Sequence, residues 1–372
     1  MVFLVCQCME LVERKEDEMK VLFLSAWYPT ERDAMAGLFV QKHAEAIAEQ
    51  GCDVCVLYSE ETGFRWVQEM YKKWQKLRKE WGMPDIVQMN VLDKNGMIAL
   101  WFKWRHRIPY IIVEHWSGYL PANYAFRGGW HGWIMRKIAK KASCILPVSQ
   151  MLEDAMKKCG IKNENWIRIH NVVDDFFYHP ISPITITPKG EKFRFLHVSC
   201  FDEKAKNVQG ILRAVRKVAE DRQDFELVLV GTGVDYHVDV DYAQSLHFPE
   251  GMLHFTGEQT PHEVAQWMQE SDCFLLFSRY ETYAVVLAEA ITMGKPIIST
   301  STAGIAAELP QECGILVPSE DEISLAQAMV QMLEKRNMYR ADTIRAKGNC
   351  FSYHNVGKQL FNIYQRTIIT QN

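Results

Sequence analysis

Short apolar runs alternate with amphipathic stretches along most of this 372-residue chain. The apolar runs hold five to seven residues and are rich in Val, Ile and Leu, which is typical of strands buried on both faces of a parallel sheet. The stretches between them, such as 39–49 and 133–141, space their apolar residues three or four apart, as amphipathic helices do. Strands and helices that alternate in this way predict doubly wound α/β domains.

The pattern falls into two halves. Strands are predicted in the first half at 21–26, 54–58, 85–89, 110–115, 144–148 and 166–170, and in the second half at 193–199, 225–231, 253–257, 273–277, 296–300 and 314–318. Between the halves, 174–192 holds three prolines and no helical period, so we interpret it as an interdomain linker. The last segment, 351–368, predicts an amphipathic helix.

These elements predict two Rossmann-like domains, at 19–178 and 179–350, and a C-terminal helix within 351–372 that we expect to pack back on the N-terminal domain. We interpret residues 1–18 as a disordered leader or a mis-assigned start, because their apolar run is too short for a signal peptide and acidic residues follow it. Two such domains leave a cleft between the carboxyl ends of their sheets, where ligands bind in these folds.

Composition favours a cytoplasmic protein. The net charge of −4 does not indicate nucleic-acid binding, and no apolar run approaches the length that a membrane-spanning helix requires. Most of the ten cysteines lie in apolar runs, which suits reduced, buried thiols better than a disulfide framework. Cys52 and Cys55 form a CxxC, but no second pair follows at zinc-ligand spacing, so we interpret them as packing residues.

The most informative segment is 278–290, which follows a predicted strand and leads into a predicted helix. Thr282 is a candidate N-cap of that helix. The amides of Tyr283, Ala284 and Val285 would then be free at the helix start. Free amides and the helix dipole together favour a phosphate group at such an end.

Two acidic residues accompany this helix start, Glu281 before it and Glu289 two turns further on. Alone, the Glu-x7-Glu spacing is a weak pattern. In this context it resembles the signature of retaining glycosyltransferases of the GT-B fold, in particular glycosyltransferase family 4. Other segments resemble motifs of the same family: VSQML (148–152), NVVDDFF (171–177), EAITMGKPII (289–298), AG (303–304) and GILVP (314–318). The resemblance extends from Met19 to the last helix and implies two Rossmann-like domains that face a central cleft.

The resemblance also implies roles for the donor-site residues. Glu281 would accept hydrogen bonds from hydroxyls of the donor sugar, and Glu289 would bind the ribose of the nucleotide. Thr282 and the amides at 283–285 would hold the diphosphate, and Gly231 is expected to contact the donor as well.

A lysine completes the expected donor site. Lys206 matches the family lysine that neutralises the leaving diphosphate, since a fixed cation stabilises the charge that builds on the β-phosphate. Lys204 is a second candidate, and spacing to the following helix favours Lys206. Cys200 stands where the family often has a partner arginine, which leaves Arg279 or Lys204 as replacement cations.

In the first half, Gly37 and His115 are the candidate site residues. Gly37 precedes a predicted helix, so its amide could approach an anionic group closely. A glycine that serves only the turn is the alternative interpretation. His115 ends a predicted strand, and the resemblance implies that it contacts the donor sugar near the scissile bond.

No catalytic metal and no cofactor other than the nucleotide-sugar co-substrate are expected. Asp239 and Asp241 form a DxD, the metal-binding signature of the other glycosyltransferase fold. The pair does not follow a strand in a nucleotide-binding half of that type, so we interpret it as a coincidence.

Two stretches of the first half combine basic residues with tryptophan. Residues 101–150 carry eight Lys or Arg and one acid, Glu114, with Trp101, Trp104, Trp130 and Trp133 interleaved. Residues 70–81 place Met70, Trp74, Leu77 and Trp81 on one face of a predicted basic helix. Such segments suit the surface of an anionic bilayer, although a core face opposite a solvated one is the simpler interpretation of each alone. We expect a glycan or lipid-linked acceptor and peripheral contact with the inner face of the plasma membrane.

The leading hypothesis is therefore a retaining glycosyltransferase of surface polysaccharide synthesis. A sugar-nucleotide epimerase of the same fold and a non-catalytic sugar-nucleotide binding protein are the alternatives. A dinucleotide oxidoreductase has little support, because no GxGxxG follows the first strand of either half.

Overall fold

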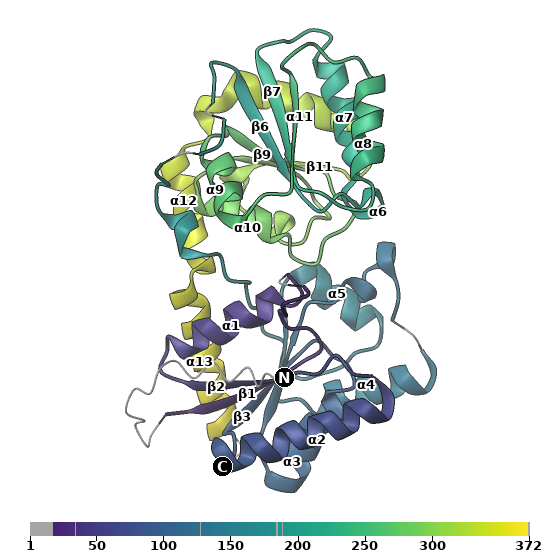
Figure 1. Ribbon diagram of the computed structural model, residues 1–372, viewed down its shortest axis with the longest axis vertical. Coiled ribbons are helices and arrows are strands. Elements are labelled where there is room, and N and C mark those ends of the chain that lie inside the picture. Colours follow the sequence, from purple (N-terminus) through teal and green to yellow (C-terminus); the bar gives the residue numbers. More distant parts are fainter. Residues whose placement is uncertain (1–17, 34, 127, 184, 188, 371–372) are drawn as a thin grey trace. The chain divides into compact units, whose positions relative to one another are not determined.

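The structure is a computed structural model that describes residues 18–370 except 34, 127, 184 and 188. Its described residues form two compact units, one of 18–172 with 353–370 and the other of 173–352 (Figure 1). Each unit contains one parallel sheet covered by helices. The predicted α/β class with two doubly wound sheets is therefore confirmed. Of the leader predicted at 1–18, only Glu18 lies within the described residues.

The N-terminal unit has a five-stranded sheet in the order β2-β1-β3-β4-β5. Its strands are β1 (Lys20–Ser25), β2 (Asp53–Leu57), β3 (Ile86–Asn90), β4 (Tyr110–Glu114) and β5 (Ile145–Pro147). Its helices are α1 (Leu38–Ala48), α2 (Gly63–Glu80), α3 (Gly96–His106), α4 (Gly129–Lys141), α5 (Gln150–Lys158) and α13 (Tyr353–Ile369). Every residue of β3 and β4 is buried, which explains why these strands read as unbroken runs rather than alternating ones.

The C-terminal helix belongs to the N-terminal unit, where it packs against α1. The two helices approach closely, since a Cβ on Gly357 would lie 2.2 Å from the carbonyl oxygen of Ala46. The buried Tyr364 hydroxyl donates to Gln88 Oε1 at 2.5 Å, and so joins α13 to the central strand β3.

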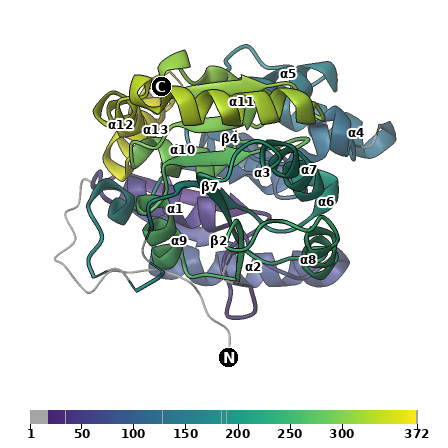
Figure 2. The same ribbon diagram turned by 90° about the horizontal axis from the view of Figure 1, so that it is seen from above.

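The C-terminal unit has a six-stranded sheet in the order β11-β10-β9-β6-β7-β8. Its strands are β6 (Phe193–Val198), β7 (Phe225–Val230), β8 (Leu253–Gly257), β9 (Cys273–Leu276), β10 (Ile297–Thr300) and β11 (Gly314–Val317). Its helices are α6 (Glu203–Lys206), α7 (Val208–Val218), α8 (Tyr236–Ser245), α9 (Pro261–Gln269), α10 (Val285–Thr292), α11 (Glu322–Lys335) and α12 (Ala341–Gly348). Helix α7 packs on α11, and α10 packs on α12 (Figure 2).

Two details differ from the predictions. The segment 166–170, predicted as a strand, forms only an isolated parallel bridge between Trp166 and Ile145. The amides of 167 and 169 donate to carbonyls of β5, but these two bonds do not make a continuous ladder. The boundary between the units falls after Val172, whereas the sequence places it after residue 178. The intervening turn packs on the C-terminal unit, where the Tyr178 hydroxyl donates to the Gly348 carbonyl at 3.0 Å.

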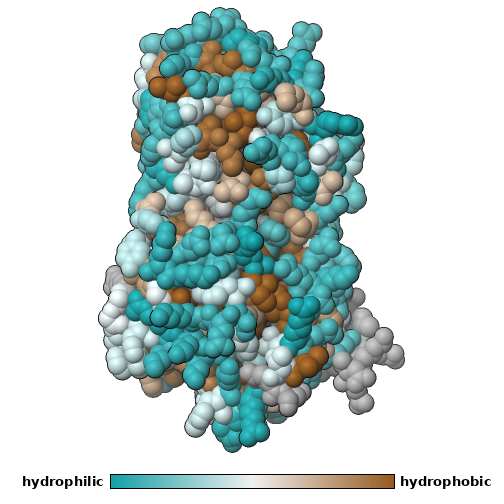
Figure 3. Space-filling view, turned by 180° about the vertical axis from the view of Figure 1, so that it is seen from behind, coloured by the Kyte–Doolittle hydropathy of each residue, from teal (hydrophilic) through white to brown (hydrophobic). Residues whose placement is uncertain are grey.

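The surface is hydrophilic over most of the face in Figure 3, and apolar residues show there in separate patches. Within the described part of the chain, no helix combines the length and the apolar character needed to cross a bilayer.

The Tyr364–Gln88 bond predicts the cost of removing one hydroxyl. Tyr364→Phe should lower the free energy of unfolding by about 1–2 kcal/mol, because it leaves a buried amide oxygen without its donor. Tyr71→Phe, on an exposed side chain, is the matched control and should change it by less than about 0.5 kcal/mol. Denaturant titration measures both, and equal midpoints would contradict the assigned role of the bond.

Candidate functional site

The C-terminal unit brings two loops together where its strand order reverses. Strands β6 and β9 are neighbours, and the chain leaves β6 in the opposite direction, towards β7. The carboxyl ends of parallel strands share one edge of the sheet, and ligands bind at such a reversal in doubly wound folds. The loops that follow these two strands contain Lys206 and Glu281.

Lys206 and Glu281 form an ion pair although they are 75 residues apart. Lys206 Nζ lies 2.5 Å from Glu281 Oε1, and the Ser278 hydroxyl donates to the same oxygen at 2.9 Å. The two charged side chains are 16% and 14% exposed. Lys204 is exposed, so the lysine that belongs to this cluster is Lys206.

The charge of Lys206 is secured by its neighbours. Burial alone would lower its pKa, but the carboxylate of Glu281 and the nearby Cys200 outweigh burial and raise the pKa above its ordinary value. Lys206 is therefore cationic at neutral pH. The ion pair is present below the ordinary pKa of lysine and is lost as the pH rises through the raised value.

Arg279 braces the site. Its guanidinium donates to the Glu203 carbonyl and to Glu320, and at 2.9 Å to Asn207 Oδ1. Its amide donates to the Ala205 carbonyl at 2.7 Å. These bonds join the loop after β9 to α6 and thereby hold Lys206 near Glu281. In this arrangement the Arg279 guanidinium is bonded to protein partners.

The helix after Glu281 begins later than predicted. Helix α10 starts at Val285 with Ala284 as its N-cap, so the predicted N-cap Thr282 is wrong. A parallel bridge between Glu281 and Ala303 keeps the backbone extended before the helix, and the Tyr283 carbonyl accepts from the Ile305 amide. The amides of the first turn are consequently those from Val285 onward, rather than those of 283–285.

Two small residues shape this helix start. Ala284 has φ 63°, a left-handed conformation that costs a residue with a Cβ about 1–2 kcal/mol. Gly304 lies close to the backbone of Tyr283, and a Cβ on Gly304 would be 2.2 Å from the Tyr283 carbonyl carbon. Glu289 lies on the second turn of α10 and is half-buried.

Gly231 serves the packing of the neighbouring loop. A Cβ on Gly231 would lie 2.0 Å from the Ser199 carbonyl oxygen, so only glycine lets the chain after β7 pass the chain after β6. Its amide donates to the Gly257 carbonyl at 2.9 Å. The backbone amide of this residue is therefore already used within the sheet edge.

His197 lies beneath the site, and the sequence did not single it out. Its Nδ1 is 2.9 Å from the Leu275 carbonyl, which can only accept, so Nδ1 carries the proton. Nε2 then accepts from the Ser199 hydroxyl at 2.8 Å. Burial lowers the pKa of His197 to about 4, the bond to Leu275 opposes this shift, and Lys206 adds to it.

In the N-terminal unit, Gly37 lies between β1 and α1 with φ 69°. A Cβ there would lie 2.5 Å from the carbonyl carbon and oxygen of Trp27. The close contact supports the interpretation of Gly37 as a turn residue. Because Gly37 is also the N-cap residue of α1, the start of this helix has no side-chain cap.

Glu114 organises the loops at the carboxyl edge of this unit. Its carboxylate, fully buried, accepts at 2.9 Å from each of the amides of Leu92, His115 and Trp116. Burial raises the pKa of Glu114 to about 7, although these three amides favour the charged form. The sequence counted Glu114 only as an acid among basic residues.

His115 is held between two residues of α1. Its ring stacks on Phe39 with centroids 3.9 Å apart, and the His43 ring lies 5.7 Å away. Burial, and then the charge of His43, lower the pKa of His115 well below its ordinary value, so the ring is neutral. His43 donates from Nε2 to the His170 carbonyl at 3.0 Å.

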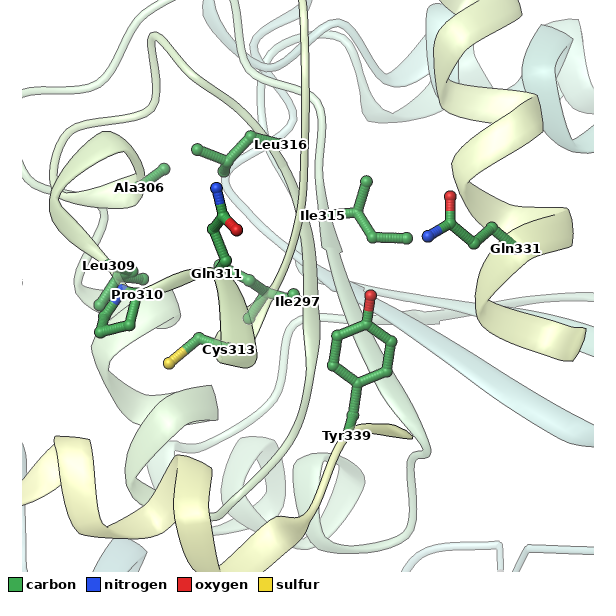
Figure 4. A pocket seen from close by; sticks show the side chains of 11 residues that line it. Ile297, Ala306, Leu309, Pro310, Gln311, Cys313, Ile315, Leu316, Gln331 and Tyr339 are labelled. Carbon is green, nitrogen blue, oxygen red and sulfur yellow. The ribbon is translucent and has the colours of Figure 1, made fainter. Parts of the chain in front are cut away.

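Two cavities of the C-terminal unit lie away from the predicted site residues. One of about 390 Å³ is lined by the first residues of β10 and β11, with Gln331 and Tyr339 on its far side (Figure 4). Another of about 380 Å³ lies between residues 177–180 and the end of α10. None of the predicted site residues lines either cavity.

The DxD pair lies on helix α8. Asp239 is buried and accepts from Gln209 Nε2 at 3.1 Å. Across the described residues, no three His, Cys, Asp or Glu side chains gather in a metal-binding arrangement.

Two Rossmann-like domains, with an acid and a lysine at the strand reversal of the second, define a glycosyltransferase of the GT-B class. The chain belongs to the retaining glycosyltransferases of family 4. Residues 36–175 match the family model described as Glycosyltransferase Family 4, and 192–335 match that of Glycosyl transferases group 1. The resemblance inferred from the motifs is thereby confirmed.

Relatives and one solved structure match the chain at low identity. The N-acetyl-alpha-D-glucosaminyl L-malate synthase of Bacillus anthracis is 26% identical over 59% of this chain and 57% of its own length. The alpha-monoglucosyldiacylglycerol synthase of Streptococcus pneumoniae is 22% identical over 83% of this chain and 72% of its own. The structure of Anabaena HepE in complex with UDP matches with a TM-score of 0.73 and 17% identity over 94% of this chain and all of that one.

The ion pair predicts a difference between two neighbouring lysines. Lys206→Met should lower the free energy of unfolding by about 2 kcal/mol, because Glu281 keeps Ser278 but loses its countercharge in a mostly buried place. Lys204→Met, on an exposed side chain, should change it by less than about 0.5 kcal/mol. Chemical denaturation near pH 7 measures the free energy of unfolding of both variants. Equal losses of unfolding free energy in the two variants would show that the ion pair does not stabilise the fold.

His197 predicts a pH dependence. Its pKa of about 4 in the fold means that unfolding takes up a proton between about pH 4 and pH 6.5. This histidine therefore contributes stability above pH 6.5 that is lost as the pH falls towards 4, with a slope of about 1.4 kcal/mol per pH unit. His197→Gln should remove that slope from the curve of unfolding free energy against pH. Parallel curves for the two proteins would contradict the burial of a neutral His197.

Proposed function

We propose that the protein transfers a sugar from a nucleotide diphosphate to a glycan or lipid-linked acceptor with retention of the anomeric configuration. The observation that carries this proposal is the Lys206–Glu281 ion pair at the strand reversal, beside the start of α10. A cation, a carboxylate and uncapped helix amides at one sheet edge suit a sugar joined to a diphosphate.

Each residue has a separate task. When the bond between the sugar and the β-phosphate breaks, negative charge builds on the phosphate, and Lys206 stabilises it. Glu281 orients the lysine and accepts bonds from hydroxyls of the donor sugar. The amides at the start of α10, near Tyr283 and Ala284, receive the diphosphate, with Thr282 beside them, and Glu289 accepts from the ribose.

Retention follows from the side of attack. The bond from the anomeric carbon to the phosphate oxygen breaks while the acceptor oxygen bonds to the same face of that carbon, and the acceptor proton passes to the departing diphosphate. The step needs no nucleophile from the protein. Neutral His115, with Gly37 in the same unit, is proposed to contact the donor, where an uncharged imidazole can donate or accept without opposing charge separation.

The acceptor is proposed to belong to surface polysaccharide synthesis at the cytoplasmic face of the plasma membrane. The name of the Streptococcus pneumoniae relative, a glucosyldiacylglycerol synthase, supports an acceptor that is a lipid. Hydrophobic anchoring of the acceptor would require the protein to work at the membrane surface without spanning it.

Removal of either charged partner should abolish transfer. Glu281→Ala and Lys206→Ala are each expected to lower the rate at least about 100-fold, since a preorganised charge in the transition state contributes about 3 kcal/mol or more. Lys204→Ala should keep the wild-type rate. Product formation is followed by release of the nucleotide diphosphate, with folding checked by circular dichroism. Wild-type rates in both site variants would place the reaction elsewhere.

The donor is identified by thermal shift across UDP-, GDP- and ADP-sugars. The UDP complex of HepE makes the UDP-sugars the first to test. A shift in the wild type that disappears in Glu289→Ala supports the ribose contact. Conversion of the donor to another sugar nucleotide without any acceptor would identify an epimerase instead.

A further inference from the structure

Three consecutive helices of the N-terminal unit form one surface layer. The strand order β2-β1-β3-β4-β5 makes the connections through α2, α3 and α4 run in the same direction, so right-handed crossovers place all three on one side of the sheet. Each helix contacts the next one. The rings of Trp74 on α2 and Phe102 on α3 have centroids 4.8 Å apart, and Lys103 Nζ of α3 donates to the Lys141 carbonyl of α4 at 2.7 Å. Figure 1 shows them gathered on the side away from α1 and α13. We call their outward side the three-helix face.

The three-helix face is strongly basic in a chain whose net charge is negative. The three helices carry twelve Lys or Arg and two Glu, against a net charge of −4 for the whole chain. Glu114, the one acid between residues 101 and 150, is fully buried and adds nothing to this surface. The exposed cations on the helices are Arg65, Lys72, Lys76, Arg78, Lys79, Arg105, Lys137, Lys140 and Lys141.

The cations crowd one another across helices. The pKa of Lys103 is lowered by burial and by the charge of Lys141. The pKa of His106 is lowered by burial and then by Arg105 and by Arg78 of the neighbouring helix. On α2, Lys73 is paired with Glu69, whose Oε1 lies 2.7 Å from the lysine Nζ. Uncompensated positive charge on one face is relieved when an anionic surface approaches.

Tryptophans project from the same face. Trp104 is 83% exposed and Trp130 is 75% exposed. Trp130 stacks on Trp133 with ring centroids 5.0 Å apart, and Lys137 Nζ lies 5.2 Å from the Trp133 centroid. Indole rings beside lysines match the interface between lipid headgroups and acyl chains, where both groups are accommodated at once.

We propose that the three-helix face docks on an anionic lipid bilayer, with Trp104, Trp130 and Trp133 entering the headgroup layer. Charge complementarity selects an anionic surface. Exposed indoles on two neighbouring helices, α3 and α4, favour a bilayer over a nucleic acid, which would be better bound by a groove. The inference deepens the proposed function by naming the surface on which an acceptor would be met. It rests on that function only for its purpose, because binding to lipid needs no catalysis.

Vesicle flotation of the full-length protein tests the docking. Vesicles of equimolar phosphatidylglycerol and phosphatidylcholine should carry the protein upward at low salt and release it at high salt, and pure phosphatidylcholine vesicles should not carry it. Lys137→Gln, Lys140→Gln and Lys141→Gln combined should weaken partitioning about 100-fold, which is roughly fivefold per lysine. Trp130→Ser with Trp133→Ser should weaken it while the salt dependence persists.

The matched control moves the same three charge changes elsewhere. Lys217→Gln, Lys335→Gln and Lys358→Gln, all on exposed lysines outside the three-helix face, should float like the wild type. Equal flotation of the two triple variants, or equal binding to neutral vesicles, would overturn the proposal. Binding to a single-stranded oligonucleotide with no binding to vesicles would replace it with a nucleic-acid surface. Unchanged melting temperatures show that each variant is folded.

Failure of this proposal is separable from failure of the proposed function. Lys206→Ala should float like the wild type, because the ion pair lies in the other unit. A protein that floats but shows no transfer would retain the docking surface and lose the proposed reaction. A protein that transfers sugar but does not float would retain the reaction and lose the surface.

Discussion

The candidate site of the C-terminal unit depends on one ion pair, between a lysine and a glutamate that the chain separates by 75 residues. Each of the two charged side chains stabilises the other in this mostly buried position. Lys206 is mostly buried, and an unpaired ammonium there would lose its charge or destabilise the fold. Glu281 supplies the countercharge, and Ser278 and Arg279 hold the two loops in the position that the pair requires. The result is a cation kept charged at the sheet edge where strand order reverses.

A buried carboxylate does comparable work in the N-terminal unit, by a different physical route. Glu114 gathers three backbone amides from the loops after β3 and β4, and so fixes the residue that follows it, His115. Phe39 and His43, one turn apart on α1, then confine the imidazole from the other side. Position and neutrality of His115 are thus properties of its packing rather than of a charged partner.

The distribution of charge gives the two units different characters. The net charge of the chain is slightly negative, yet three adjacent helices of one unit are almost free of acids. The topology makes this asymmetry effective, because consecutive right-handed crossovers put those helices on one side of one sheet. The Lys206–Glu281 ion pair and the basic surface are therefore separate features, one in each unit, and they depend on different physical constraints.

The amino-acid sequence alone determined the fold class and most strands to within a residue or two, because burial on both faces of a parallel sheet leaves a local apolar signature. It also singled out Glu281 and Lys206 through a family resemblance. It misplaced the start of α10, since the bridge from Glu281 to Ala303 overrides the local capping preference of Thr282. Roles for His197, Arg279 and Glu114 emerged only in three dimensions. Tertiary structure decided these because hydrogen bonds and ion pairs between loops depend on strand order, whereas periodicity reports only whether each segment is buried.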